Sequence, residues 1–354
     1  MKPVLFVTGH APSYRVGAFA RLHELEDVEF ALFAGPSRHG GAAFDGELPF
    51  PHRHVRPRQL ARLAASGRYR AVVCPTGGRL APSAGWAGAR LARVPVILWA
   101  SLWAHPKSPA HALSYLPLRR LYRSADAVVT YGPHVSAYVR ARGAHNVHIA
   151  PQSVDNDFWS APPSSPPNWP TRAQVTFLFA GRPHAEKGLR VLTDAWRETG
   201  LREPSAALIL VGAGAGEDRP AGVHGLDAVG PRELRDMYSA ADALVVPSIA
   251  TRTFREPWGL VVNEAMCRAL PVIATDQVGA VAGRLVRDGE NGLVVGAGDS
   301  AGLARAISLL AGDEALRRRL GDAGARDIRA YSHEAWARGF SQALFSLDLS
   351  RGRW

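Results

Sequence analysis

Residues 254–275 read FREPWGLVVNEAMCRALPVIAT. Two glutamates, Glu256 and Glu264, bracket a run of seven residues within it. The pattern predicts a helix over 259–269, and the short apolar run that follows predicts a strand over 271–275. The first carboxylate could simply favour the positive end of the helix dipole, with the second on the surface. The rest of the chain has to distinguish that interpretation from a ligand site.

The same alternation of strand-like and helix-like segments extends over both halves of the chain. In the second half, strands are predicted at 175–183, 206–216, 242–248, 271–275 and 292–295, and helices at 188–200, 232–241, 259–269, 301–312, 313–331 and 333–347. In the first half, strands are predicted at 3–8, 28–35, 69–76, 95–100 and 125–132, and helices at 16–25, 83–93 and 113–124. Strands that alternate with helices indicate parallel sheets covered on both faces.

A break in this pattern divides the chain. Residues 161–170 are nearly all Pro, Ser, Ala or Asn, which is a linker composition. The sequence therefore predicts an α/β protein with two doubly wound, Rossmann-like domains and a cleft between them. The predicted domains span 1–160 and 173–330, with 161–172 as the linker. A length of 354 residues suits two domains of ordinary size.

The cysteine content and the lengths of the apolar runs indicate the cellular compartment. The two cysteines, Cys74 and Cys267, have no metal-site spacing, and a reduced cytosolic compartment is expected. The apolar run at 3–8 is too short for a signal-peptide core. The longest apolar stretch, 95–104, is far below the roughly 20 residues that span a bilayer. We expect a cytoplasmic protein without a membrane-spanning segment.

The formal net charge of +11 is concentrated in the first half. Residues 1–160 carry 19 Lys and Arg against 9 Asp and Glu, whereas residues 161–354 carry 23 against 22. No acid occurs between Glu47 and Asp126, a stretch with 13 basic residues. Genome composition explains 39 Arg against 3 Lys but does not explain the missing acids. The stretch predicts a basic face toward a membrane surface, a phosphorylated lipid or a nucleic acid.

Three loops of the second half carry usable chemistry, because ligands of doubly wound sheets bind where loops leave the carboxyl ends of strands. The loop AGRPHAEKGL (180–189) offers Arg182 and Lys187, a basic pair that could hold a diphosphate or form an exposed turn. The loop VGAGAG (211–216) fits a dinucleotide fingerprint poorly. The third loop is the opening stretch, where the N–H groups that start the helix favour phosphate. Two carboxylates at this offset could bind hydroxyls at two places on one extended polyol.

Together these segments resemble a known family. EPWGLVVNEA, with AGRPHAEKGL upstream and RDGENGLVV (287–295) downstream, resembles the retaining glycosyltransferases of the GT-B fold, in particular family 4. The resemblance covers roughly residues 150–345 well and the N-terminal domain in outline. It implies that the N-terminal domain binds the acceptor and the second domain the nucleotide sugar. It also implies that the final segment, 331–354, crosses back to the N-terminal domain.

The resemblance assigns roles to individual residues. Glu256 contacts the donor sugar near the reacting centre, and Glu264 binds the ribose hydroxyls. Arg182 and Lys187 bind the diphosphate. The nucleotide-sugar site also takes in Gly181, the amides of Trp258, Gly259 and Leu260, and the N-terminal glycines Gly9 and Gly17, while the segment 225–230 faces the base. In the family a histidine after the fourth or fifth N-terminal strand often lies near the donor sugar, and His105 is the best positional candidate, although it could also be a loop histidine with no role. The predicted catalytic residues are thus Glu256, Arg182, Lys187 and His105.

The sequence also departs from the family's pattern. Gly283 stands where an acid is expected after the strand at 271–275. The loop 8–17 lacks a paired glycine, and Arg15 could supply charge there. His10 and His134 are weaker histidine candidates than His105.

The implied activity is transfer of a hexose-type sugar from a nucleotide-diphosphate sugar, UDP first and GDP second, with retained configuration. No Asp-x-Asp motif is present, so neither a metal nor any other cofactor is expected. The expected partners are the nucleotide sugar and a hydroxyl acceptor, lipid-linked or anionic, at the inner face of the cell membrane. The alternative is a GT-B enzyme with a non-glycan acceptor or epimerase-like activity. No nucleic-acid-binding module is visible, and nucleic acid is not an expected partner.

Overall fold

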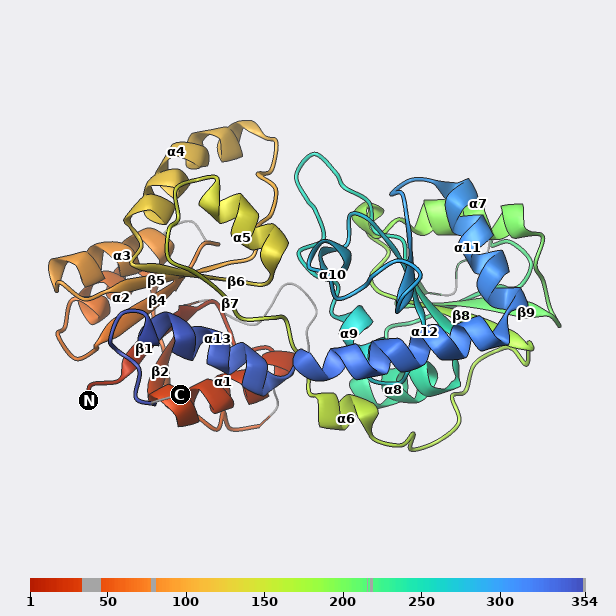
Figure 1. Ribbon diagram of the computed structural model, residues 1–354, viewed down its shortest axis with the longest axis horizontal. Helices are drawn as coiled ribbons and strands as arrows, with labels where there is room; N and C mark the ends of the chain where they lie inside the picture. The colour runs from red at the N-terminus through yellow and green to blue at the C-terminus, as the bar shows by residue number, and fades with distance from the viewer. Residues whose placement is uncertain (34–45, 78–80, 215, 217–218, 353–354) are drawn as a thin grey trace. The chain divides into compact units, whose positions relative to one another are not determined.

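The computed structural model describes residues 1–33, 46–77, 81–214, 216 and 219–352. The chain forms two compact units, Met1–Asp155 with Tyr331–Trp354, and Asn156–Ala330. The end of the predicted strand 28–35 and Ala215 of the glycine-rich loop lie outside the described residues. Each unit is an α/β layer structure (Figure 1).

The first unit is built on a parallel sheet of seven strands in the order β3-β2-β1-β4-β5-β6-β7. Its strands are β1 (Val4–Thr8), β2 (Val28–Leu32), β3 (His52–His54), β4 (Ala71–Pro75), β5 (Val96–Ala100), β6 (Ala127–Thr130) and β7 (Val147–Ile149). Its helices are α1 (Ser13–Glu26), α2 (Pro57–Ala64), α3 (Ala81–Leu91), α4 (Pro109–Ser124), α5 (Pro133–Arg140) and α13 (His333–Phe345).

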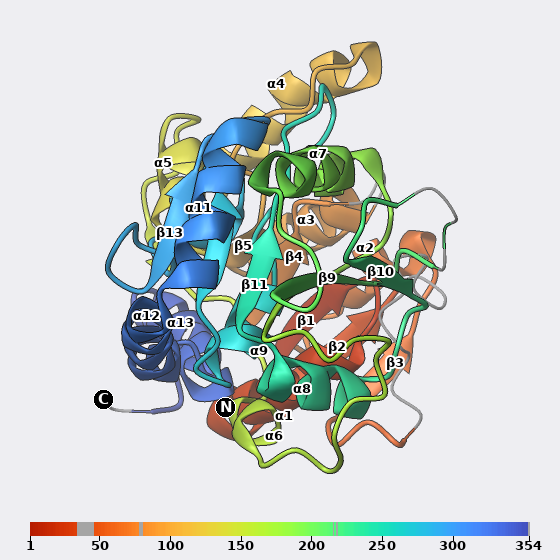
Figure 2. The same ribbon diagram turned by 90° about the vertical axis from the view of Figure 1, so that its right-hand side faces the viewer.

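The second unit repeats this order with β10-β9-β8-β11-β12-β13, again parallel throughout. Its strands are β8 (Val175–Ala180), β9 (Ala206–Val211), β10 (Val223–Leu226), β11 (Ala243–Val246), β12 (Val272–Thr275) and β13 (Gly292–Val295). Its helices are α6 (Asn156–Ser160), α7 (Leu189–Thr199), α8 (Pro231–Ala240), α9 (Val261–Met266), α10 (Gly279–Ala282), α11 (Ser300–Gly312) and α12 (Glu314–Asp327), with 3₁₀ turns η1 (Ala185–Lys187) and η2 (Ile328–Ala330). Figure 2 shows α7 and α11 side by side on one face of this sheet and α8 and α9 on the other.

Both sheets have the strand order of a doubly wound Rossmann fold, so the predicted fold class is confirmed. The order reverses between β1 and β4 in the first sheet and between β8 and β11 in the second. Loops at such a reversal diverge to opposite faces of the sheet and leave a crevice at the carboxyl ends of the strands. The two reversals are therefore where each unit can bind a ligand.

Three short strands, β3, β7 and β10, were not predicted. They are edge strands with polar residues, and β3 is the sequence HRH. The predicted helix over 259–269 is shorter than expected, since α9 spans Val261–Met266. Gly259 has φ +88°, a left-handed conformation that excludes it from the helix.

The residues of β1 alternate between two cores, because successive side chains of a strand point to opposite faces. Val4 and Phe6 pack in the cluster that includes α1 and α13, whereas Leu5 and Val7 pack in the cluster that includes α2 and α3. Helix α13 contributes Trp336 and Phe340 to the first cluster, with ring centroids 5.6 Å (Phe19–Trp336) and 5.3 Å (Phe6–Phe340) apart. The C-terminal segment is thus part of the core of the first unit.

The Pro/Ser-rich segment 161–172 lies in the second unit. The backbone N–H groups of Ser164 and Ser165 donate to the Asp236 carboxylate at 2.9 and 3.2 Å, and these bonds lower the pKa of Asp236. The Arg235 guanidinium donates to the Ser164 hydroxyl at 2.6 Å. Two charged side chains of α8 therefore hold this segment on the helix.

We predict that Trp336→Ala lowers the free energy of unfolding by about 3–5 kcal/mol, because it removes a fully buried indole from a packed core. Urea unfolding followed by circular dichroism measures the change. Phe345→Ala on the same helix is the control, since that ring is 58% exposed and should cost far less. Equal losses in the two variants would contradict a core role for α13.

Candidate functional site

The candidate site begins with an ion pair at the strand-order reversal of the second sheet. Loop 181–188 leaves β8 and loop 247–260 leaves β11, and these two strands are neighbours. Lys187 closes η1 in the first loop, and its ammonium group pairs with the Glu256 carboxylate of the second loop. Both side chains are largely shielded, at 25% and 10% exposure. The sequence predicted that both residues belong to one site but not that they contact each other.

Close backbone packing brings the two loops together. Gly188 has φ +70°, and a Cβ atom there would lie 1.9 Å from the carbonyl oxygen of Pro247. The Ile249 N–H donates to the Glu186 carbonyl oxygen at 2.9 Å. A side chain at position 188 would separate the loops, so Gly188 is required for the Lys187–Glu256 contact.

Trp258 fixes the chain between Glu256 and α9. It is buried, its indole N–H donates to the Asn263 side-chain oxygen at 2.7 Å, and its carbonyl oxygen accepts from the Ala280 N–H at 2.8 Å. A Cβ atom on Gly283 would lie 2.4 Å from Cζ3 of the indole. Glycine stands at the position of the expected acid because the Trp258 ring occupies the space that an acidic side chain would need.

Glu264 has a different environment from Glu256. It lies in the first turn of α9, where the Tyr238 hydroxyl donates to its carboxylate at 2.9 Å. Burial raises the pKa of Glu264 to about 7, although the Tyr238 hydrogen bond opposes this shift. Glu256 lies five residues before the helix. The dipole interpretation therefore fits neither glutamate, because Glu256 is too far from the helix and the charged form of Glu264 is disfavoured.

Arg182 lies in the loop after β8, and the glycine-rich loop follows the neighbouring strand β9. Arg182 directly follows Gly181 at the end of β8 and is exposed. Among the described residues, no acid lies within ion-pair distance of it. Gly212 has φ +85°, and a Cβ atom there would lie 2.6 Å from the Gly181 carbonyl oxygen. The glycines at 212 and 181 thus allow the loops after β8 and β9 to touch.

The segment 287–295 supports the structure of the second unit. The buried Asn291 amide donates to the carbonyl oxygen of Leu285 at 2.8 Å and to the Asp327 carboxylate at 2.7 Å. Its oxygen accepts from the Arg287 N–H at 2.7 Å. Asn291 therefore fixes the segment before β13 against Asp327 at the end of α12.

The candidates of the N-terminal half lie in the first unit. Both ring nitrogens of His105 have partners there, the Tyr138 hydroxyl at 3.3 Å and the His111 carbonyl oxygen at 2.7 Å. His134 packs on Trp103 with ring centroids 5.3 Å apart. These contacts hold the loop after β5, and the catalytic role of His105 stays a prediction.

The two N-terminal glycines and Arg15 have distinct surroundings. Gly9 and His10 directly follow β1, whereas Gly17 lies in α1, where a Cβ atom would be 2.4 Å from Nδ1 of His333. Packing against α13 accounts for Gly17 without a ligand. The buried Arg15 guanidinium donates to the Gln152 side-chain oxygen and has no acidic partner among the described residues. Within the same described part of the chain, no group of three or more His, Cys, Asp or Glu could hold a metal ion.

Two family models match the chain, one in each unit. Residues 4–152 match the "Glycosyl transferase 4-like domain", and residues 174–313 match "Glycosyl transferases group 1". The chain belongs to the group 1 glycosyltransferases. Curated relatives include a phosphatidyl-myo-inositol mannosyltransferase of Mycobacterium leprae, 35% identical over 54% of this chain and 51% of the relative. A D-inositol 3-phosphate glycosyltransferase of Xylanimonas cellulosilytica is 30% identical over 70% of this chain and 65% of the relative.

Solved structures agree on the architecture of this chain. The Anabaena protein Alr3699/HepE in complex with UDP has a TM-score of 0.74 at 18% identity, covering 97% of this chain and all of that one. Sucrose-phosphate synthase from Thermosynechococcus elongatus has a TM-score of 0.71 at 20% identity, covering 98% and 99%. The two Rossmann-like units are those of the GT-B fold, as predicted. The matched segments span only about half to two thirds of the length of the two curated relatives.

Sequence reasoning missed two residues of this site. Tyr238 on α8 holds Glu264, and Asn263 holds Trp258. Asn263 is the neighbour of Glu264 in the quoted stretch, and a buried amide within an apolar helix is the signal that could have found it. No sequence pattern points to Tyr238, since it contacts a residue of another helix that is 26 positions away in the chain.

We predict that Glu264 makes the protein less stable as the pH rises. The folded state keeps a proton on Glu264 up to about pH 7, whereas the unfolded chain loses it near the ordinary value of 4.5. Stability should therefore fall between these pH values, by ~3 kcal/mol at about 1.4 kcal/mol per pKa unit. Urea unfolding from pH 4.5 to 8 measures the slope.

Glu264→Gln should remove this part of the slope and match the wild type at low pH. Glu314→Gln, a substitution of an exposed glutamate on α12, is the matched control and should leave the slope unchanged. An unchanged slope in the Glu264 variant would refute the raised pKa.

Proposed function

We propose that this protein is a retaining glycosyltransferase that takes a hexose-type sugar from a nucleotide-diphosphate sugar, UDP first and GDP second. One observation carries the proposal. The loops at the strand-order reversal of the second sheet bring Lys187 and Glu256 into contact, in the order of the family's motif. The family membership of both units supports the activity.

The proposed binding mode assigns one part of the donor to each group. Exposed Arg182 and the ammonium group of Lys187 bind the diphosphate, together with backbone amides of Trp258, Gly259 and Leu260. Lys187 has three N–H donors, so it can hold a phosphate oxygen and keep its contact with Glu256. Glu264 accepts hydrogen bonds from the ribose hydroxyls, which requires its carboxylate form. Nucleotide binding should then lower the pKa of Glu264.

The chemical step needs stabilisation of the leaving diphosphate. Arg182 and Lys187 supply fixed positive charge where negative charge develops as the glycosidic bond breaks. In the proposed mechanism, the acceptor hydroxyl attacks the face from which the diphosphate leaves. A departing phosphate oxygen takes the acceptor's proton. Glu256 orients the sugar through its hydroxyls and forms no covalent intermediate, and the basic pair takes the place of a metal ion.

The relatives and structural neighbours support a nucleotide donor and an anionic acceptor. The Anabaena neighbour is a complex with UDP, and related structures of it contain UDP-glucose or UDP with glucose. The two curated relatives act on phosphatidyl-myo-inositol and D-inositol 3-phosphate, which both carry phosphate. We propose an acceptor of this kind, lipid-linked or otherwise anionic. A non-glycan acceptor or an epimerase-like reaction remains the alternative, and product analysis distinguishes the two.

Helix α4 supports contact with an anionic membrane. Leu113 and Leu116 are 81% and 69% exposed, and the same helix carries Arg119, Arg120 and Arg123. This helix lies in the stretch between Glu47 and Asp126, which contains no Asp or Glu. Its basic side chains therefore have no acidic neighbours in the sequence that would weaken their attraction to an anionic surface. No helix among the described residues is long and apolar enough to cross a bilayer. We propose that α4 docks the enzyme to the inner face of the cell membrane.

The donor site is tested with UDP, GDP, dTDP and their sugars in a thermal-shift screen. A nucleotide at about 100 times its Kd stabilises the folded state by about 2.7 kcal/mol, so one class of nucleotide should raise Tm clearly. Glu256→Gln should reduce sugar transfer by about 10²–10³-fold, the cost of losing one charged contact to the reacting group. UDP binding should persist, because Lys187 stays available to the phosphates.

The control for Glu256→Gln is Glu186→Gln, a change of a loop carboxylate that pairs with His184 instead. It should leave transfer unchanged. A chain that responds to no nucleotide, or full transfer by the Glu256 variant, would remove the proposed donor site.

Membrane docking is tested by co-sedimentation with vesicles. Binding should require anionic lipid and weaken with salt. The double variant Leu113→Gln and Leu116→Gln should bind less, and replacing Arg119 and Arg120 by Gln should cost about 1 kcal/mol for each charge. Leu309→Gln, at a leucine of the second unit that is 49% exposed, is the control. Equal binding to neutral vesicles would contradict the docking surface.

A further inference from the structure

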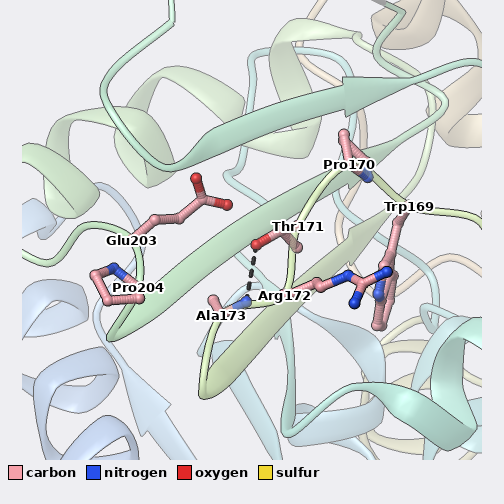
Figure 3. A pocket seen from close by; sticks show the side chains of 7 residues that line it. All are labelled: Trp169, Pro170, Thr171, Arg172, Ala173, Glu203 and Pro204. Atoms are coloured by element: carbon pink, nitrogen blue, oxygen red, sulfur yellow. Dashed lines mark hydrogen bonds between the residues drawn. The ribbon is translucent and has the colours of Figure 1, made fainter.

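A cavity lies in the second unit, apart from the loops of the candidate donor site. It has a volume of ≈ 370 Å³, within the range of about 300–1,000 Å³ that is usual for small-ligand pockets. Figure 3 shows the residues that line it, which are Trp169, Pro170, Thr171, Arg172, Ala173, Glu203 and Pro204. In that view Glu203 and Arg172 lie on either side of Thr171.

The cavity is at the opposite edge of the sheet from the donor loops. Residues 169–173 precede β8, and Glu203 and Pro204 precede β9, so the cavity lies at the amino ends of these strands. Lys187 and Gly212 follow the carboxyl ends of the same two strands. Six residues of strand at about 3.3 Å each separate the two edges, or ~20 Å. The chemistry of donor binding therefore does not account for this cavity.

Glu203 is held in place as a carboxylate. Its Oε1 atom lies 3.1 Å from Nε2 of His224 on β10. A hydrogen bond with the Thr171 side chain is the main cause of a lowered pKa for Glu203. The Thr171 hydroxyl oxygen accepts a hydrogen bond from the Ala173 N–H at 3.0 Å. The hydroxyl hydrogen of Thr171 is not used in this bond and is available to the Glu203 carboxylate. The contact with His224 places this carboxylate at the wall of the cavity, where its oxygens can accept hydrogen bonds.

Arg172 supplies donors beside this acceptor. Its side chain is exposed, and within the part of the chain that the structure describes it forms no ion pair with Glu203 or another acid. A fixed carboxylate and a guanidinium thus line one cavity without neutralising each other. Because the two charges are opposite, together they give the cavity no net preference for an anion or a cation. A neutral ligand with neighbouring hydroxyls satisfies both, because hydroxyls donate to the carboxylate and accept from the guanidinium.

Trp169 adds an apolar surface to these polar groups. The face of an indole ring is electron-rich, and the C–H groups on one side of a pyranose ring carry partial positive charge and pack on such a face. We propose that this cavity is a carbohydrate-binding site that holds one or two pyranose units of a glycan, remote from the reacting sugar. A polypeptide is disfavoured by the small volume and by an apolar lining that is limited to Trp169, Ala173 and the two prolines.

Saturation-transfer NMR on the full chain tests this site, with maltose, α-1,6-mannobiose and lactose as probes. The measurement is made with saturating UDP, so that the donor site is occupied, and is repeated in the Glu256→Gln variant. At least one of the disaccharides should give a saturable signal under both conditions. Because the readout is sugar binding and not transfer, failure of the proposed enzymatic function would not affect it.

Trp169→Ala should abolish the signal, and Arg172→Ala and Glu203→Gln should each reduce the affinity by about tenfold, the loss of one charge-assisted hydrogen bond. Arg190→Ala, at a side chain that is 96% exposed on α7, is the matched control for Arg172→Ala and should bind as the wild type does. Arg172 is exposed, so its variant should keep the wild-type Tm even if Trp169→Ala does not fold. Binding of none of the three sugars, or undiminished binding by the folded Arg172 and Glu203 variants, would overturn the proposal.

Discussion

The ion pair between Lys187 and Glu256 joins the two loops that form the candidate site of the second unit. It joins residues that are 69 positions apart and come from the loops after β8 and β11, the two strands where the sheet order reverses. Each charge lies in a largely shielded place, and such a charge is costly without a partner. The pair therefore gives each of these two shielded charges its partner. In the binding mode that we propose, it also places a cation beside the diphosphate. A lysine suits this arrangement better than an arginine, because its compact ammonium group can turn its three donors toward different oxygens.

Most of the fold could be predicted because buried parallel strands have continuous apolar sequences. The runs at 3–8 and 271–275 became β1 and β12 with ends displaced by one residue at most. The edge strand β3 was missed because its sequence HRH has neither apolar residues nor alternation, and only pairing with β2 makes it a strand. The length of α9 was overestimated, since an apolar pattern does not show that Gly259 adopts a left-handed conformation.

The order of charged residues in the loops predicted the candidate site, but close approaches of backbone could not be predicted. Nothing in the sequence places Gly188 on the Pro247 carbonyl oxygen, and this approach determines that Lys187 meets Glu256. In the same way, the sequence shows that position 283 has a glycine in place of the expected acid, but it does not show why. The Trp258 ring fills that space, so one large side chain accounts for a glycine 25 positions further along the chain.

The division of the first unit between the two ends of the chain has a consequence for its synthesis. The core around Phe6 and Phe19 is complete only when Trp336 and Phe340 of α13 reach it. The 175 residues of the second unit, 156–330, are translated in between, which takes about 10 to 35 s at 5–20 residues per second. During this time the ribosome carries a first unit whose α13-binding face is uncovered and apolar. The second unit, which is continuous in sequence, can complete its folding before the first.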